Sequence, residues 1–154
     1  MYSQKFMKQA IAQAKRAQKY SEAPIGAVIV YNGEVISRGR NKREGKKNSL
    51  AHAEIEAIEK ACKKIGDWRL EDCDLYVTLE PCPMCAGAII QSRIKNLYFG
   101  AYDYKAGCAG SKTDLFSPGL FNHDVNVEGG KLEEECSSLL KNFFKNLREL
   151  KKNN

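Results

Sequence analysis

The sequence predicts an α/β domain in which helices are layered on a central mixed sheet of five strands. Apolar residues recur at helical spacing in several segments, and short β-branched runs lie between those segments. After an initial hairpin, strands alternate with helices, which is typical of strands that pair in parallel. The length of 154 residues suggests one domain, residues 1–154, and 43% apolar and 29% charged residues are ordinary for a globular protein.

The first half of the chain is expected to hold two helices and a hairpin. Phe6 and Ala10 begin an apolar stripe at helical spacing, and Asn32-Gly33 joins two β-branched runs. Asn-Gly is a strong hairpin signal because both residues accept a positive φ. Gly66 is expected to end the second helix. The predicted elements are a helix over 2–20, strands over 24–31 and 34–40, and a helix over 51–65.

The second half alternates strands with helices. Pro83 fits the first position of a helix, where its missing N–H costs nothing. An apolar stripe that starts at Leu132 continues at helical spacing to Leu150. The predicted elements are a strand over 73–79, a helix over 83–93, a strand over 94–102, a short edge strand over 124–130 and a final helix from 132 to the end.

The formal net charge is +6, and the basic residues gather in two places. Residues 38–47, "RGRNKREGKK", carry six bases and one acid, and residues 141–154 carry five bases and one acid. Such clusters suit a polyanion such as nucleic acid, although a solvated loop and a frayed terminus would look the same. No apolar run approaches the ~20 residues of a membrane span, and no export signal is seen, so a cytoplasmic protein is expected.

Two of the six cysteines form a close pair at a predicted strand-to-helix junction. Cys82 and Cys85 lie three residues apart at the start of a helix, where the helix dipole favours thiolates. Two thiolates at this spacing suit zinc, but an isolated C-x-x-C is also found in thiol redox proteins. The remaining cysteines are expected to be small buried residues; they are Cys62, Cys73, Cys108 and Cys136.

The third metal ligand is most plausibly His52, which is one of only two histidines. Glu54 follows at i+2, and inside a helix two such side chains point about 200° apart. His52 and Glu54 must therefore lie at the very start of the predicted helix if they serve one site. Three protein ligands leave a position for water, as in catalytic zinc sites, and a neighbouring carboxylate can take the proton of that water. His123 is expected to be structural.

The pairing of "HAE" with "PCPMC" resembles the H-x-E…P-C-x-x-C signature of the zinc-dependent cytidine deaminase superfamily. Within that superfamily the chain resembles the bacterial tRNA-specific adenosine deaminases over almost its whole length. The stretches that carry this resemblance are "EAPIGAVIV", "GRN", "AHAEI", "LYVTLEPCPMCAGAI", "FGAYDYKAG" and "AGS". The resemblance implies a cytidine deaminase-like, three-layer α-β-α fold with helices on both faces of the sheet.

The resemblance also implies an activity, a cofactor and partners. It implies hydrolytic conversion of adenosine to inosine at the wobble position of a tRNA anticodon loop. One Zn²⁺ per subunit would be held by His52, Cys82 and Cys85, with Glu54 as the catalytic proton shuttle. The partners would be a tRNA anticodon stem-loop and a second copy of the chain in a homodimer, with no membrane. Residues matching the family's substrate-binding positions are Asn41, Pro24, Ile25, Asp103, Lys105 and Phe144.

Other readings of the same residues remain open at this point. A deaminase of free guanine, cytosine or cytidine would use the same zinc and carboxylate. A zinc-stabilised RNA-binding module would need no carboxylate at the position of Glu54. Tyr102, Tyr104 and Cys108 depart from the family pattern and leave the detail of that loop open. Glu80, beside the cysteines, is expected either to be structural or to support the site from behind its ligands, because the catalytic carboxylate is already assigned.

Overall fold

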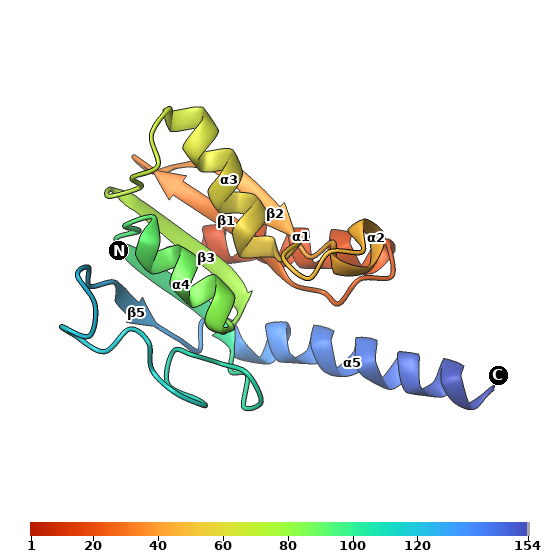
Figure 1. Cartoon of the computed structure of the whole chain (residues 1–154). Helices are drawn as coiled ribbons and strands as arrows, with labels where there is room; N and C mark the ends of the chain where they lie inside the picture. Colours follow the sequence, from red (N-terminus) through yellow and green to blue (C-terminus); the bar gives the residue numbers. More distant parts are fainter. Residues whose placement is uncertain (154) are drawn as a thin grey trace.

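The computed structural model describes residues 1–153 and contains a single five-stranded sheet (Figure 1). The elements in chain order are α1 (Gln4–Lys19), β1 (Gly26–Tyr31), β2 (Glu34–Arg40), α2 (Arg43–Lys46), α3 (Ala53–Ile65), β3 (Cys73–Leu79), α4 (Pro83–Gln91), β4 (Asn96–Ala101), β5 (Asn126–Glu128) and α5 (Glu133–Lys152). The predicted strands and helices are all present, with ends that shift by a few residues.

The strands lie in the order β2-β1-β3-β4-β5 and form a mixed sheet. The β1–β2 hairpin and the β1–β3 pair are antiparallel, whereas β3–β4 and β4–β5 are parallel. Asn32 and Gly33 both have positive φ in the hairpin turn, as the sequence indicated. The later strands are therefore parallel as predicted, and their carboxyl ends meet at one edge of the sheet.

Helices cover both faces of the sheet, so the predicted three-layer α-β-α arrangement is confirmed (Figure 1). Helices α3 and α4 pack on one face over a core that includes Leu75 and Val77 of β3. Helices α1 and α5 pack on the other face, where Tyr76 of the same strand is buried. Alternate residues of β3 thus serve opposite cores, as the pleat of a strand requires.

Three features differ from the sequence-based expectation. Residues 43–46 of the basic stretch form the short helix α2, which no apolar periodicity announced. Residues 51 and 52 are not helical; α3 begins at Ala53 because His52 keeps an extended backbone. The apolar stripe of α5 is buried at Cys136 but exposed at Leu147 and Leu150, where the helix extends beyond the sheet (Figure 1).

No helix among the described residues has the length and apolar character that crossing a lipid bilayer requires.

Candidate active site and metal centre

The two helices on one face of the sheet bring their N-termini together beside a pocket of about 230 Å³. His52 is the N-cap residue of α3, and Cys82 is the N-cap residue of α4. Pro83 follows Cys82 at the start of α4, and Cys85 is buried in its first turn. The predicted convergence of two helix N-termini is therefore observed.

The side chains of His52, Cys82 and Cys85 form a cluster of potential metal ligands. One donor atom from each lies within 4.8 Å of the other two. His52 Nδ1 is 3.7 Å from Cys82 Sγ and 3.5 Å from Cys85 Sγ. Tetrahedral zinc with ordinary Zn–N and Zn–S bonds places such atoms roughly 3.6 Å apart. Two sulfurs and one imidazole nitrogen at these separations fit a zinc ion.

The three groups of the cluster are coupled through hydrogen bonds to the Cys82 sulfur. The pKa of the Cys82 thiol is lowered to about 4, because the Cys85 thiol and the His52 ring donate hydrogen bonds to it. The pKa of His52 is raised by its hydrogen bond to Cys82, and the pKa of Cys85 is raised because its thiol donates to Cys82. Cys82 is therefore favoured as a thiolate, whereas Cys85 and His52 would each have to release a proton when a metal ion binds.

Glu54 occupies the first turn of α3 and lines the same pocket. Its side chain is buried, with 4% of the residue exposed. Burial raises the pKa of this carboxyl group to about 7, although a hydrogen bond from its own backbone N–H opposes the shift. At the helix start, the i+2 spacing from His52 brings both side chains to one pocket, which a position inside the helix would prevent.

The pocket wall includes several of the residues that the resemblance singled out. Four of them line the pocket: Ile25, Asn41, Asp103 and Phe144. Asn41 is 6% exposed, and its side chain is held by the Ala23 carbonyl and the Arg43 N–H. These four side chains come from segments far apart in the sequence.

Two residues of that set do not line this pocket. Pro24 is buried next to Ile25, and Lys105 is exposed on the loop that carries Asp103. The Asp103 carboxylate accepts hydrogen bonds from the N–H groups of Lys105 and Ala106, which fixes the turn of this loop. A role of Lys105 in substrate binding would therefore be exerted outside the pocket.

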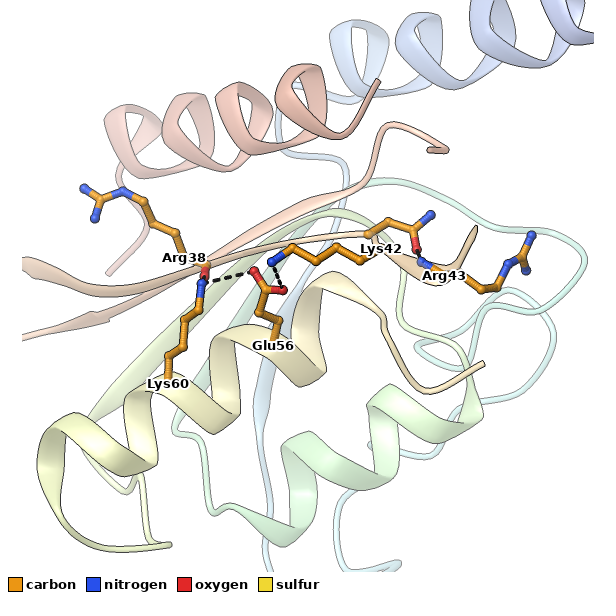
Figure 2. Close-up of polar contacts among 6 residues, drawn as sticks. Arg38, Lys42, Arg43, Glu56 and Lys60 are labelled. Atoms are coloured by element: carbon orange, nitrogen blue, oxygen red, sulfur yellow. Dashed lines mark hydrogen bonds and ion pairs between the residues drawn. The ribbon is translucent and has the colours of Figure 1, made fainter. Parts of the chain in front are cut away.

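Arg43 lines the pocket but was not singled out from the sequence. Within the basic stretch, Lys42 pairs with Glu56 of α3, whereas the Arg43 side chain points away from that pair (Figure 2). In the sequence, Arg43 is marked only by its membership of a ten-residue basic run, and such a run does not reveal which of its cations faces a pocket. The tertiary structure is needed to distinguish Arg43 from its neighbours.

The remaining thiols and the second histidine have structural environments. Cys73, Cys108 and Cys136 are buried and Cys62 is half-buried, and each is a free thiol. His123 Nε2 lies 2.8 Å from the Ile94 carbonyl oxygen. Among the residues that the structure describes, His52, Cys82 and Cys85 are the one group of side chains that could hold a metal ion.

Comparison with known proteins shows which proteins share this arrangement. Residues 1–148 match the MafB19-like deaminase family. The chain is also 53% identical to the tRNA-specific adenosine deaminase of Bacillus subtilis over 147 residues, which cover 96% of this chain and 91% of that protein. The chain belongs to the tRNA-specific adenosine deaminase family. The resemblance inferred from the two motifs is thus confirmed over nearly the whole of this deaminase.

Solved structures agree with this assignment to the deaminase family. One from a study of A-to-I editing by tRNA:A34 deaminases at the tRNA wobble position has a TM-score of 0.83 and 42% identity, covering 90% of this chain and all of that one. A guanine deaminase from Bacillus subtilis has a TM-score of 0.65 and 35% identity, covering 97% of this chain and 95% of that one. The fold is therefore shared with a deaminase of a free base. The fold alone does not determine the substrate, which must be argued from the residues that line the pocket.

Proposed function

We propose that this deaminase converts adenosine to inosine at the wobble position of a tRNA anticodon loop, with a zinc ion held by His52, Cys82 and Cys85. The observation that carries the proposal is the close grouping of these three donors with the buried Glu54 in one pocket. Near full-length similarity to tRNA-specific adenosine deaminases supports the choice of adenosine in tRNA.

The chemistry divides between the ion and the protein. When bound, zinc supplies the Lewis acidity that makes a water molecule nucleophilic near neutral pH. With the ion in place, Glu54 would take one proton from the attacking water and deliver it to N1 of adenine, and it would then carry the second proton of the same oxygen to the departing amine, so that ammonia leaves. Burial keeps Glu54 away from bulk solvent, and its position in the first turn of α3 places it beside the ligand cluster.

The pocket suits a base that has left its stack. Ile25 and Leu79 offer apolar surface, and Asn41 is held in one orientation by its two hydrogen bonds. Arg43 and Phe144 are exposed residues at the pocket, where a cation can approach a phosphate and an aromatic ring can stack on a base. An anticodon loop offers unstacked nucleotides, which reduces the cost of inserting one of them.

The proposal is tested with an unmodified anticodon stem-loop that carries a wobble adenosine. We expect inosine at that position with the zinc-loaded protein. Glu54→Gln should retain stoichiometric zinc and the fold but lose at least about 10²-fold in rate, because the proton shuttle is absent. An active, folded Glu54→Gln variant would refute the assigned role of Glu54.

Parallel assays separate the other readings. Turnover of free guanine or a cytosine compound without turnover of the stem-loop would replace the proposed substrate with a free base. RNA binding without any deamination would favour a zinc-stabilised binding module. A redox protein would be favoured if Cys82 and Cys85 cycle between thiol and disulfide in a zinc-free preparation. In the zinc-loaded deaminase, both thiols should be protected from alkylation.

We also propose that the chain is one deaminase domain that functions as a homodimer in the cytoplasm, where tRNA is modified. Support comes from the match of residues 1–148 to one deaminase family and from the RNA contacts that the family resemblance implies for both subunits. Analytical ultracentrifugation at micromolar concentration tests the oligomeric state, and a monomer that retains full activity would exclude the dimer as a requirement.

A further inference from the structure

Two glutamates beside the pocket are almost fully buried but bind backbone N–H groups. Glu22 and Glu80 each have 2% of the residue exposed. Glu22 lies just after α1, and Glu80 follows β3 directly. Burial of an ionised carboxylate is costly unless hydrogen bonds replace its hydration. The partners of these two side chains therefore indicate what their burial accomplishes.

Glu80 binds both ends of the loop at residues 103–111. Its carboxylate accepts hydrogen bonds from the N–H of Asp103 at 3.0 Å, from the N–H of Ala109 at 2.9 Å and from the N–H of Ser111 at 3.1 Å. The Ser111 hydroxyl donates a further short hydrogen bond. Between these anchors the loop contributes Asp103 and Ala106 to the pocket wall. Glu80 thus joins this wall to the strand end that precedes Cys82.

The same loop lies directly on the carboxylate. A Cβ atom added at Gly107 would be 2.4 Å from Glu80 Cδ and 2.5 Å from the Asp103 carbonyl oxygen. The next residue, Cys108, is hydrogen-bonded to the residue before Cys82, because its N–H donates to the Pro81 carbonyl oxygen at 2.8 Å. Hydrogen bonds and close packing together leave the loop little freedom to shift relative to Cys82.

Glu22 has an equivalent arrangement with another segment that lines the pocket. Its carboxylate accepts hydrogen bonds from the N–H of Glu44 at 2.9 Å and from the N–H of Gly45 at 2.7 Å. This wall, residues 41–45, contributes Asn41 and Arg43 to the pocket. The Asn41 N–H also donates to the Ile25 carbonyl at 3.0 Å. Glu22 therefore holds the segment that carries these two residues against the chain that follows α1.

We propose that Glu22 and Glu80 are positioning residues of the deamination site, each of which holds one wall of the substrate pocket through backbone N–H groups. The inference rests on the proposed function for the reaction that it affects. Glu80 is also part of the pocket lining and Glu22 is not, but the carboxylate oxygens of both are occupied by backbone N–H groups of the walls through which they act. A carboxylate is suited to this task because it accepts several N–H donors, whereas a glutamine amide would turn one donor group toward them.

The test compares Glu80→Gln and Glu22→Gln with Asp74→Asn as a matched control. Asp74 accepts a hydrogen bond of 2.7 Å from the Asn96 side chain at the start of β3, which is the end of the strand away from Cys82. All three variants replace a hydrogen-bonded carboxylate by an amide. Only the first two do so beside the pocket.

The zinc-loaded proteins are assayed with the stem-loop at a temperature well below each Tm. Full zinc content and a kcat/KM that falls on the order of 10- to 100-fold are expected for Glu22→Gln and Glu80→Gln, because small misplacements of a binding wall are costly. Asp74→Asn should lower Tm with kcat/KM unchanged. Glutamine variants that lower only Tm would overturn the proposal, since that is the behaviour of a purely structural carboxylate.

Hydrogen exchange supplies a second readout that does not depend on activity. In Glu80→Gln the amides of Asp103, Ala109 and Ser111 should exchange faster, while the amides of β3 should be unchanged. Gly107→Ala tests the same wall with the carboxylate intact, and it should reproduce both the exchange pattern and the loss in kcat/KM even if Glu80→Gln is too unstable to purify. Unchanged exchange in these variants would contradict the proposed anchoring.

The two proposals fail in different ways. If the unsubstituted protein does not deaminate the stem-loop, the proposed function fails. Hydrogen exchange of the loop amides still tests whether Glu80 anchors the pocket wall. If the unsubstituted protein is active and the glutamine variants match it in kcat/KM, only the positioning role fails.

Discussion

Glu56 shows how one carboxylate connects the basic stretch to the helix that carries His52. It forms ion pairs with Lys42 at 2.6 Å and with Lys60 at 3.1 Å, and the Lys60 amine also donates to the Arg38 carbonyl (Figure 2). Burial disfavours ionisation of Glu56, but the two lysines outweigh it and lower the pKa of this carboxyl group. Two lysines thus share one partly buried negative charge within the fold, which makes both of them less available to a polyanion.

This lowered pKa makes a pH-dependent contribution to stability. The folded protein binds the Glu56 proton less readily than the unfolded chain, so the contribution is complete above the ordinary value of about 4.5 and is lost as the pH falls through the lower folded pKa. Glu56→Gln should therefore reduce the free energy of unfolding by about 1–2 kcal/mol at pH 7 and by progressively less below about pH 4.5. Urea unfolding from pH 7 to pH 3.5 measures the difference.

Glu59→Gln is the control for this measurement, because Glu59 is an exposed carboxylate on the same helix. Its effect should stay within about 0.5 kcal/mol across the range. A Glu56→Gln difference that is independent of pH would contradict the assigned ion pairs.

At the scale of elements, the approach of α3 to β2 depends on one glycine. A Cβ atom at Gly39 would lie 2.1 Å from the Ala53 carbonyl oxygen and 2.8 Å from the Ala57 backbone nitrogen. Ala53 lies between His52 and Glu54 in the first turn of the helix. Because Gly39 has no side chain, the start of α3 can lie close against β2. This helix start carries the predicted metal ligand His52 and the predicted proton shuttle Glu54.

Gly39→Ala should push this turn away from the sheet. We expect a loss of about 1–3 kcal/mol in stability, as is usual for overpacking, together with less than one zinc per chain after metal reconstitution. Thermal unfolding and metal analysis of the same preparation measure both effects. Gly87→Ala is the control, because a Cβ atom at this position of α4 meets no atom within 4 Å in the chain. Full zinc content and an unchanged Tm in Gly39→Ala would show that the turn tolerates displacement.

At the scale of the whole molecule, α5 has two halves with different environments. Its first half buries Cys136 and packs Leu139 and Leu140 against the sheet. Its second half extends away from the sheet, where Leu147 and Leu150 are exposed and Phe144 reaches the pocket (Figure 1). The body of the protein is thus complete without the last turns, which leaves their basic side chains free to meet the proposed RNA.

Replacing the last four bases by glutamine should weaken RNA binding without unfolding the protein. The quadruple variant is Lys145→Gln, Arg148→Gln, Lys151→Gln and Lys152→Gln. Affinity for the stem-loop should fall, and the slope of log affinity against log salt should decrease by about one to three, because fewer counterions are released. Binding is measured with Glu54→Gln in the background, so that no product forms.

The expected Tm change is small because these side chains are exposed. The control replaces Lys8 and Lys15 of α1, two exposed lysines near the other end of the chain, by glutamine, and should leave the salt slope unchanged. An unchanged slope in the quadruple variant would exclude the tail from the RNA interface.

Local features of this protein could be predicted from short stretches of sequence. Asn32-Gly33 specified the hairpin, and Pro83 after Cys82 specified the start of α4, because turn and helix-start preferences depend on a few adjacent residues. The i+2 spacing of His52 and Glu54 placed both residues at a helix start, since only there do such side chains share a site. These inferences needed no knowledge of distant contacts.

Which distant groups meet is visible only in the folded chain. It selected Arg43 from a run of similar cations, left the end of the α5 stripe exposed, and brought Glu22 and Glu80 to backbone N–H groups more than twenty residues away. Periodicity and composition record whether a residue prefers burial, but they do not record its partner. A carboxylate that binds the backbone leaves no complementary residue in the sequence, and for that reason the two pocket anchors emerge only from the fold.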